Sequence, residues 1–245
     1  MLTALALLVL VPAATFWAVR AGALEDLRNE GLAAAQSRAL TLESILDRQR
    51  AVVAILADDA MVKSILRGSA REGRDAVSAK LERLGAETQS AVLYLLDADG
   101  RTIAASNWNQ PDSFVGHDYS FRNYFRQAHP TAMEFALGTV SGQPGLYLSH
   151  DVRDGAAVLG VVVVKVQFDA LESAWARSPN ATHVTEGDGR VIITTDPARR
   201  FAVAGPPAPD SLPITLPVRG TRWTVTMLVP LREVQQTAGY AAGAA

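Results

Sequence analysis

The sequence of 245 residues contains no cysteine. This absence excludes a disulfide framework, a thiol nucleophile and any zinc or iron–sulfur site that needs cysteine ligands. The chain also lacks an excess of either charge, because 23 Lys and Arg residues face 25 Asp and Glu residues. Nucleic-acid-binding proteins usually show a basic excess, so we expect no nucleic-acid partner. The hydrophobic content of 49% excludes a largely disordered chain.

Familiar enzyme motifs are missing as well. The four histidines are scattered along the chain and form no H-E-x-x-H pair. Ser141 lies in the sequence GTVSG, which is not the nucleophile elbow G-x-S-x-G. The sequence has no phosphate-binding P-loop. We therefore predict no catalytic residue, no metal and no cofactor in this segment.

The longest uncharged stretch lies at the N-terminus, where residues 2–19 carry no charged side chain. A helix needs roughly 20 apolar residues to cross a bilayer, so residues 1–20 are predicted to form a retained membrane anchor. A signal peptide cleaved near Ala21-Gly22-Ala23 and a buried helix of a soluble protein are the alternatives. Residues 231–245 form an exit segment, either a disordered tail or the start of a second span. With two spans, the middle of the chain would be extracytoplasmic.

Residues 21–88 show the periodicity of helices. Leucine, isoleucine, valine and alanine recur at spacings of three, four and seven, which predicts one long amphipathic helix. We expect a break near Asp58-Asp59, a short helix over 60–67 and another over 73–88. The long helix is either a core helix or a stalk that leaves the membrane and pairs with a second copy of the chain.

After residue 90 the hydrophobic period changes to two. Asp99-Gly100 is typical of a hairpin turn between two strands. Three further strands and a short helix complete an antiparallel sheet of the PAS-like type over residues 89–172. A smaller copy with its own strand–Asp-Gly–strand pattern follows over 173–230. The predicted fold class is α+β, with a long N-terminal helix and two PAS-like lobes.

One candidate for binding chemistry is the sequence DYSFRNYFRQA at 118–128. On a helix, Tyr119, Arg122 and Arg126 would share one face, and Phe121, Tyr124 and Phe125 would face the core. Arginine forms a bidentate pair with a carboxylate, and a tyrosine hydroxyl can add a hydrogen bond. The alternative is a surface arginine that happens to lie near a tyrosine.

A second cation, Lys165, interrupts the apolar strand VVVVKVQF. It either guards a sheet edge or is a buried cation that requires an anionic partner. Thr139 and Ser141 are expected on one face at the end of one strand, and Tyr147 and Ser149 on one face of the next. One arginine and one lysine on opposed elements would suit a small dianion.

These features resemble the extracytoplasmic sensor region of C4-dicarboxylate transport sensor histidine kinases of the DctB type. The resemblance covers nearly the whole chain. The residues that carry it are Ser106-Asn107-Trp108, Phe114-Val115-Gly116, DYSFRNYF at 118–125, Gly138-Thr139-Val140-Ser141-Gly142, Tyr147-Leu148-Ser149 and VVVVKVQFDALE at 161–172.

The resemblance implies the double Cache (PDC) fold and binding of succinate, fumarate or malate in the membrane-distal lobe, residues 89–172. Arg122 and Tyr119 would hold one carboxylate, and Lys165 with Thr139 and Ser141 the other. Tyr147 and Ser149 are further candidate ligands, while Tyr124 belongs to the core.

The resemblance also implies a parent protein larger than these residues. Kinase activity, its ATP and a cognate response regulator would belong to that parent. The parent would be a homodimer in the bacterial inner membrane. Its residues from about 21 to 230 would lie in the periplasm. Two alternatives remain open. One is an amino-acid chemoreceptor ectodomain of the same fold, with Asp118, Asp151 or Asp169 for the ammonium group, and the other is a partner-binding ectodomain without a small ligand.

Overall fold

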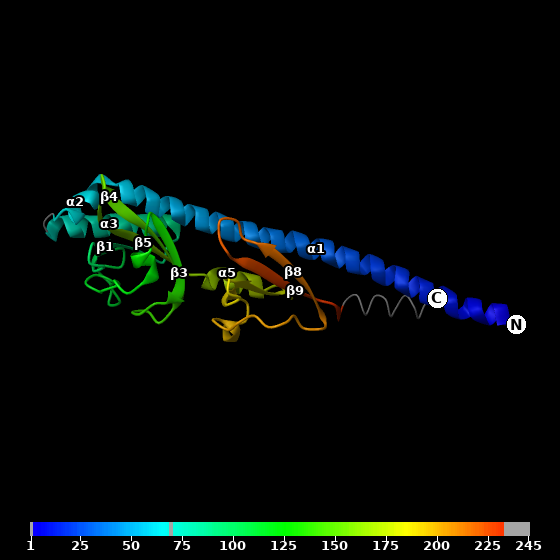
Figure 1. The fold of residues 1–245 in the computed structure, drawn as a ribbon. Helices are drawn as coiled ribbons and strands as arrows, with labels where there is room; N and C mark the ends of the chain where they lie inside the picture. The colour runs from blue at the N-terminus through cyan, green and yellow to red at the C-terminus, as the bar shows by residue number, and fades with distance from the viewer. Residues whose placement is uncertain (1, 69–70, 233–245) are drawn as a thin grey trace. The chain divides into compact units, whose positions relative to one another are not determined.

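The computed structural model describes residues 2–68 and 71–232. It divides into two compact units, one of residues 44–168 and one that combines the chain up to residue 43 with the chain from 169 onward. The first elements are helices, α1 (Leu2–Asp58), α2 (Ala60–Leu66) and α3 (Arg71–Thr88) (Figure 1). The helix order and the break near Asp58-Asp59 are as predicted.

Asp59 explains the break. Its backbone is extended, and its carboxylate accepts hydrogen bonds from the N–H groups of Met61 at 3.1 Å and Val62 at 3.2 Å. These are two of the N–H groups that lack a partner within the first turn of a helix, so Asp59 is the N-cap of α2.

The side chains of most of the predicted anchor, and most of the predicted exit segment, lie outside what the structure describes, so the structure does not test these two predictions. The backbone is helical from Leu2, but the side chains of residues 1–13 and all of residues 233–245 lie outside the described residues. In the described part of the chain, no helix has an apolar stretch long enough to cross a membrane. The anchor and the exit segment stay predictions.

The 44–168 unit contains a five-stranded antiparallel sheet in the order β2-β1-β5-β4-β3. Its elements are β1 (Val92–Asp97), β2 (Thr102–Ala105), α4 (Asn123–Arg126), β3 (Thr131–Leu137), β4 (Pro144–Asp154) and β5 (Ala157–Val166). The predicted PAS-like sheet is confirmed. α3 packs against β1 and β2 (Figure 1), and α4 packs against β3 and β4.

Strand β5 lies in the middle of this sheet. Lys165 is paired in register with Val92 of β1 on one side and Tyr147 of β4 on the other. The interpretation of Lys165 as an edge guard is therefore wrong, because both edges of β5 are occupied. The continuous apolar run of this strand follows from burial on both faces.

The segment before α4 corrects the predicted helix. The helix covers only Asn123–Arg126, and Arg122 is its N-cap with an extended backbone. Phe121, predicted for the core face, is 57% exposed, whereas Tyr119 is 3% exposed. The Tyr119 N–H donates to the Gly100 carbonyl at 2.8 Å, so residues before Arg122 follow the β1–β2 hairpin instead of coiling.

Glycine is required at Gly100 for two reasons. Its φ of 84° favours glycine, and a Cβ there would lie 2.6 Å from the Ser120 Cα. The Asp99-Gly100 turn therefore positions the segment that contains Tyr119 and Arg122, in addition to joining two strands.

The other unit contains α5 (Asp169–Ala176), β6 (Ala181–Thr185), β7 (Val191–Thr194), the 3-10 helix η1 (Pro197–Arg199), β8 (Ser211–Pro217) and β9 (Thr224–Pro230). Its sheet has the order β7-β6-β9-β8, which confirms the predicted second antiparallel sheet. Its core includes Ala35 of α1 and Ile214, Met227 and Val229 of the sheet. The Glu172 carboxylate ties α5 to β7 by accepting from the Thr194 N–H at 2.9 Å.

Candidate functional site

Lys165 is the most buried charged side chain of the predicted site, with 2% of its surface exposed. Its ammonium donates to the Ser141 hydroxyl at 2.8 Å and lies 6.0 Å from the centre of the Tyr147 ring. A buried charge is costly unless polar groups surround it. The sheet thus fixes a cation among hydroxyl groups at the end of its central strand.

Gly138 marks where these groups converge. A Cβ on Gly138 would lie 2.6 Å from the Ser141 Oγ, 3.0 Å from the Tyr147 hydroxyl and 3.2 Å from the Lys165 Nζ. The absence of a side chain at this position leaves the three polar atoms facing one small space.

Ser141 and Thr139 reach the site from a turn, which corrects their predicted place on a strand. Strand β3 ends at Leu137, and the turn is closed by a hydrogen bond from the Gly142 N–H to the Gly138 carbonyl at 2.9 Å. Gly138 and Gly142 lie at the two ends of this turn. Ser141 therefore contacts Lys165 from the turn and not from the strand.

Arg122 supplies the second cation. Its Nη2 donates to the Leu137 carbonyl at 2.6 Å, and its guanidinium lies 5.7 Å from the centre of the Tyr147 ring. The guanidinium Nε is buried and has no hydrogen-bond partner among the described residues. Buried polar groups in native proteins are nearly always paired, so this N–H is suited to a bound acceptor.

Tyr147 connects the two cations, because its ring lies about 6 Å from each of them. Burial raises the pKa of its hydroxyl to about 12, against the opposing effect of the Arg122 charge. The hydroxyl is therefore neutral at ordinary pH and can donate. Like the Arg122 Nε, it is buried without a hydrogen-bond partner in the described part of the chain.

Tyr119 lies in the aromatic cluster beside this pair. Its ring centre is 5.6 Å from that of Tyr94, and the neighbouring Phe114 closes the cluster at 5.9 Å. Burial raises the pKa of Tyr119, an effect that the nearby Thr139 and the Arg122 charge partly offset. The structure thus brings Tyr119 and Thr139 together.

Ser149 has a different role from the one predicted for a pocket residue. Its hydroxyl donates to the Tyr124 carbonyl at 2.6 Å and is buried. This bond fixes α4 to β4. Tyr124 itself is fully buried in the core cluster, as expected.

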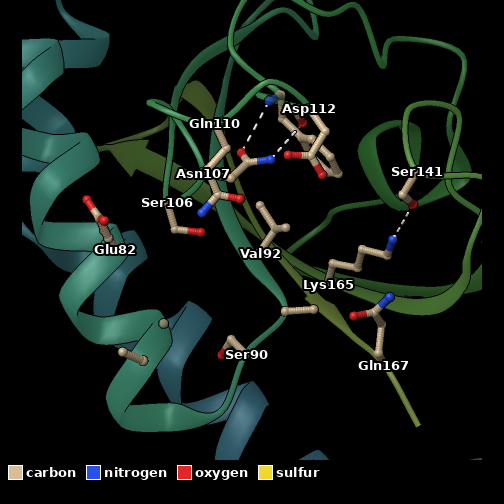
Figure 2. Close-up of a pocket in the computed structure, with 14 residues that line it drawn as sticks. Glu82, Ser90, Val92, Ser106, Asn107, Gln110, Asp112, Ser141, Lys165 and Gln167 are labelled. Carbon is tan, nitrogen blue, oxygen red and sulfur yellow. Dashed lines mark hydrogen bonds between the residues drawn. The ribbon is translucent and has the colours of Figure 1, made fainter. Parts of the chain in front are cut away.

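A cavity of about 330 Å³ borders Ser141 and Lys165 (Figure 2). This volume is at the small end of the range of ligand pockets, roughly 300–1,000 Å³. Of the predicted ligand residues, only Ser141 and Lys165 are among its lining. The remaining five are not: Tyr119, Arg122, Thr139, Tyr147 and Ser149. Its lining also includes Ser90, Val92, Ser106, Asn107, Gln110, Asp112, Glu82 and Gln167.

The acidic residues proposed for an amino-acid ligand do not line this cavity. Asp118 is exposed and accepts from the Ser120 N–H at 2.8 Å. Asp151 is buried and pairs with Arg153 at 2.7 Å. Asp169 begins α5, in the other unit. The carboxylates that do border the cavity are those of Glu82 and Asp112.

Sequence reasoning missed Glu134. This residue of β3 is opposite Tyr147 in register, and its carboxylate lies 3.7 Å from Arg122 Nη1. A charge inside the apolar strand TAMEFAL is the same signal that identified Lys165. Arg122 therefore has a carboxylate neighbour within the protein.

The sequence was compared with protein families and with known proteins. No protein-family model matches the sequence. The chain is 43% identical over 195 residues to the C4-dicarboxylate transport sensor protein DctB of Rhizobium meliloti (strain 1021). The match covers 79% of this chain and 31% of that protein, so the chain spans about a third of the relative's length.

Solved structures agree in fold. The DctB histidine kinase sensor domain of V. cholerae superposes with a TM-score of 0.72 and 24% identity, covering 85% of this chain and 98% of that one. The ligand-binding domain of the Pseudomonas fluorescens chemoreceptor CtaA, in complex with L-isoleucine, gives a TM-score of 0.67 with 15% identity and covers 89% of this chain and 98% of that one. The resemblance indicated by the sequence motifs is thus confirmed: the chain has the double Cache fold and is a homologue of the sensor region of DctB-type C4-dicarboxylate transport sensor proteins.

Proposed function

We propose that the 44–168 unit binds a C4-dicarboxylate such as succinate, fumarate or malate. Arg122 and Tyr119 hold one carboxylate, and Lys165 with Thr139 and Ser141 holds the other. One observation carries the proposal most directly. The buried Arg122 Nε and the Tyr147 hydroxyl have no hydrogen-bond partner in the described residues, and the Tyr147 ring lies about 6 Å from both cations.

The energy of such contacts is sufficient. A hydrogen bond to a charged group contributes roughly 1.5–3 kcal/mol, and association costs about 4 kcal/mol or more. Four or five such bonds leave a net free energy near the roughly −8 kcal/mol of micromolar binding. Arginine and lysine together suit a ligand with two carboxylates because each cation can pair with one of them.

We further propose that residues from about 21 to 230 form the periplasmic sensor region of a larger membrane-anchored histidine kinase. Two observations support this assignment: the Rhizobium meliloti relative is named as a transport sensor protein and is longer than this chain, and the V. cholerae sensor domain of the same fold is that of a histidine kinase. Kinase activity, ATP and the response regulator belong to that parent protein. The ligand would signal by favouring one packing of two α1 helices in a homodimer, which requires unequal affinity for the two states. Crosslinks between paired helices in membranes should change with succinate, and identical crosslinks would contradict this mechanism.

Calorimetric titration of the purified chain tests the ligand assignment. Succinate, fumarate and malate are compared with L-serine and L-isoleucine. We expect heat with at least one dicarboxylate and its loss in Arg122→Ala and in Lys165→Met. Arg126→Ala is the matched control, since Arg126 is exposed at the end of α4.

The other outcomes identify the alternatives. Heat with amino acids alone would favour the chemoreceptor ectodomain, for which Glu82 and Asp112 at the cavity offer partners to an ammonium group. No heat with either class would favour an ectodomain that binds a protein partner. Full binding by both cation variants would contradict the assigned site.

A further inference from the structure

Glu134 has two neighbours that both belong to the start of α4. One carboxylate oxygen accepts from the Tyr124 N–H at 3.1 Å, and the other lies 3.7 Å from Arg122 Nη1. Arg122 offers no side-chain cap to this helix. Glu134 thus supplies from β3 the acceptor that the N-terminus of α4 needs, and its negative charge is placed beside the guanidinium.

The guanidinium has enough donors for a second acceptor. An arginine presents five N–H donors in a planar fork. In Arg122, Nη2 donates to the Leu137 carbonyl, Nη1 faces Glu134, and the buried Nε has no partner in the part of the chain that the structure describes. A ligand carboxylate at Nε would therefore share one guanidinium with the carboxylate of Glu134.

Glu134 acts on Arg122 through its charge and does not hold the guanidinium in place. The contact of 3.7 Å exceeds the length of a hydrogen bond, whereas the Leu137 carbonyl holds the guanidinium at 2.6 Å. The Glu134 side chain is 18% exposed, so solvent screens its charge only in part. Its field also raises the pKa of the adjoining Tyr147 hydroxyl.

We propose that Glu134 is a residue of the binding site that limits its affinity for dianions. This inference rests on the proposed function. A carboxylate fixed beside Arg122 cancels part of the attraction that the guanidinium offers and repels the incoming ligand carboxylate. Like charges repel each other most strongly where water is excluded.

The test is succinate calorimetry on the wild-type chain, Glu134→Gln and Glu134→Asp. Glutamine keeps an oxygen for the Tyr124 N–H and removes the charge, so we expect the Kd for succinate to fall about tenfold, or about 1.4 kcal/mol. Aspartate keeps the charge on a shorter side chain, and we expect no gain in affinity. A purely structural role cannot produce tighter binding in the neutral variant.

The outcomes are separable from those of the proposed function. A wild-type chain that binds no dicarboxylate would refute the function itself. Wild-type binding with equal or weaker affinity in Glu134→Gln would overturn this inference alone. Glu134→Asn repeats the test with a shorter amide and should also tighten binding. Loss of cooperative thermal unfolding in both neutral variants would likewise overturn it, because Glu134 would then be required for folding.

Discussion

Lys165 and Tyr147 are direct partners across β5 and β4, and the lysine ammonium lies 6.0 Å from the centre of the tyrosine ring. The same ring lies 5.7 Å from the Arg122 guanidinium. One aromatic side chain in the sheet therefore contacts two cations from different elements. A substitution at Tyr147 therefore tests the site and leaves both cations in place.

Replacing Tyr147 by phenylalanine removes the hydroxyl and keeps the ring beside both cations. We expect succinate affinity to fall about five- to tenfold, since one hydrogen bond contributes roughly 1–1.5 kcal/mol. Tyr94→Phe is the matched control, because Tyr94 belongs to the same buried aromatic cluster and is not among the three groups nearest to a Cβ at Gly138. Calorimetry with succinate measures both. Equal losses in the two variants would show that packing of the cluster, and not the Tyr147 hydroxyl, controls affinity.

Tyr147 also predicts a dependence of stability on alkaline pH. Burial raises the pKa of its hydroxyl to about 12, while an unfolded tyrosine ionises near pH 10. As pH rises above about 10, the unfolded chain releases this proton and the folded chain retains it, so the free energy of unfolding falls. Urea unfolding at pH 9 and pH 11 should show a smaller decrease in Tyr147→Phe than in wild type. An identical decrease would contradict the raised pKa.

Gly138 provides a steric test of the convergence of polar groups. A Cβ there would press on Ser141, Tyr147 and Lys165. We expect Gly138→Ala to weaken succinate binding by at least about tenfold, a loss of about 1.4 kcal/mol, because the methyl group takes the space that these atoms face.

The control for this substitution is Gly205→Ala, since no atom lies within 4 Å of a Cβ at Gly205. Thermal unfolding of both variants separates lost binding from lost folding. A folded Gly138→Ala chain with wild-type affinity would mean that the ligand does not occupy the space beside Gly138.

Asp59 predicts acid sensitivity in the 44–168 unit. Burial raises its pKa, but hydrogen bonds from Lys80 and from the Val62 N–H outweigh that effect and hold the pKa below its usual value. A lowered pKa stabilises the folded chain above the unfolded pKa of about 3.9, and this contribution is lost as pH falls through the lower folded value.

The variant Asp59→Asn keeps an N-cap acceptor and loses the titrating charge. We expect it to show a smaller drop in stability between pH 7 and pH 3 than wild type. Asp59→Ala loses the cap as well and should cost about 1 kcal/mol at pH 7. Denaturant unfolding followed by circular dichroism measures both. An unchanged pH response in Asp59→Asn would refute the assigned role.

The fold could be predicted largely from local patterns. The change of hydrophobic period after residue 90 and the Asp-Gly turns are encoded within short segments, and the structure confirms both sheets. The break at Asp58-Asp59 was predictable for the same reason, because Asp59 caps the helix that follows it.

The faces of the segment 118–128 could not be predicted in this way. Helical periodicity placed Phe121 in the core and Tyr119 opposite, but the hydrogen bond from Tyr119 to Gly100 keeps the residues before Arg122 out of the helix. This hydrogen bond to the β1–β2 hairpin overrides the local helix propensity. It cannot be predicted from the residues of the segment alone. Likewise, β3 ends at Leu137 and a turn from Gly138 to Gly142 follows it. Thr139 and Ser141 therefore lie in this turn and not in the strand where they were predicted.

Two charged residues within apolar strands, Lys165 and Glu134, illustrate both outcomes within the site. Lys165 was identifiable because a charge interrupts an apolar strand, and sheet order then decided between an edge and a central position. Glu134 carries the same signal in β3, but its significance depends on its distance from Arg122, which only the folded chain defines.

A crystal structure of the chain with bound succinate tests the central claim most directly. The account predicts one succinate carboxylate within hydrogen-bond distance of the Arg122 Nε and the other within hydrogen-bond distance of the Lys165 Nζ, with the Tyr147 hydroxyl beside the ligand. Succinate bound in contact with neither cation would contradict it.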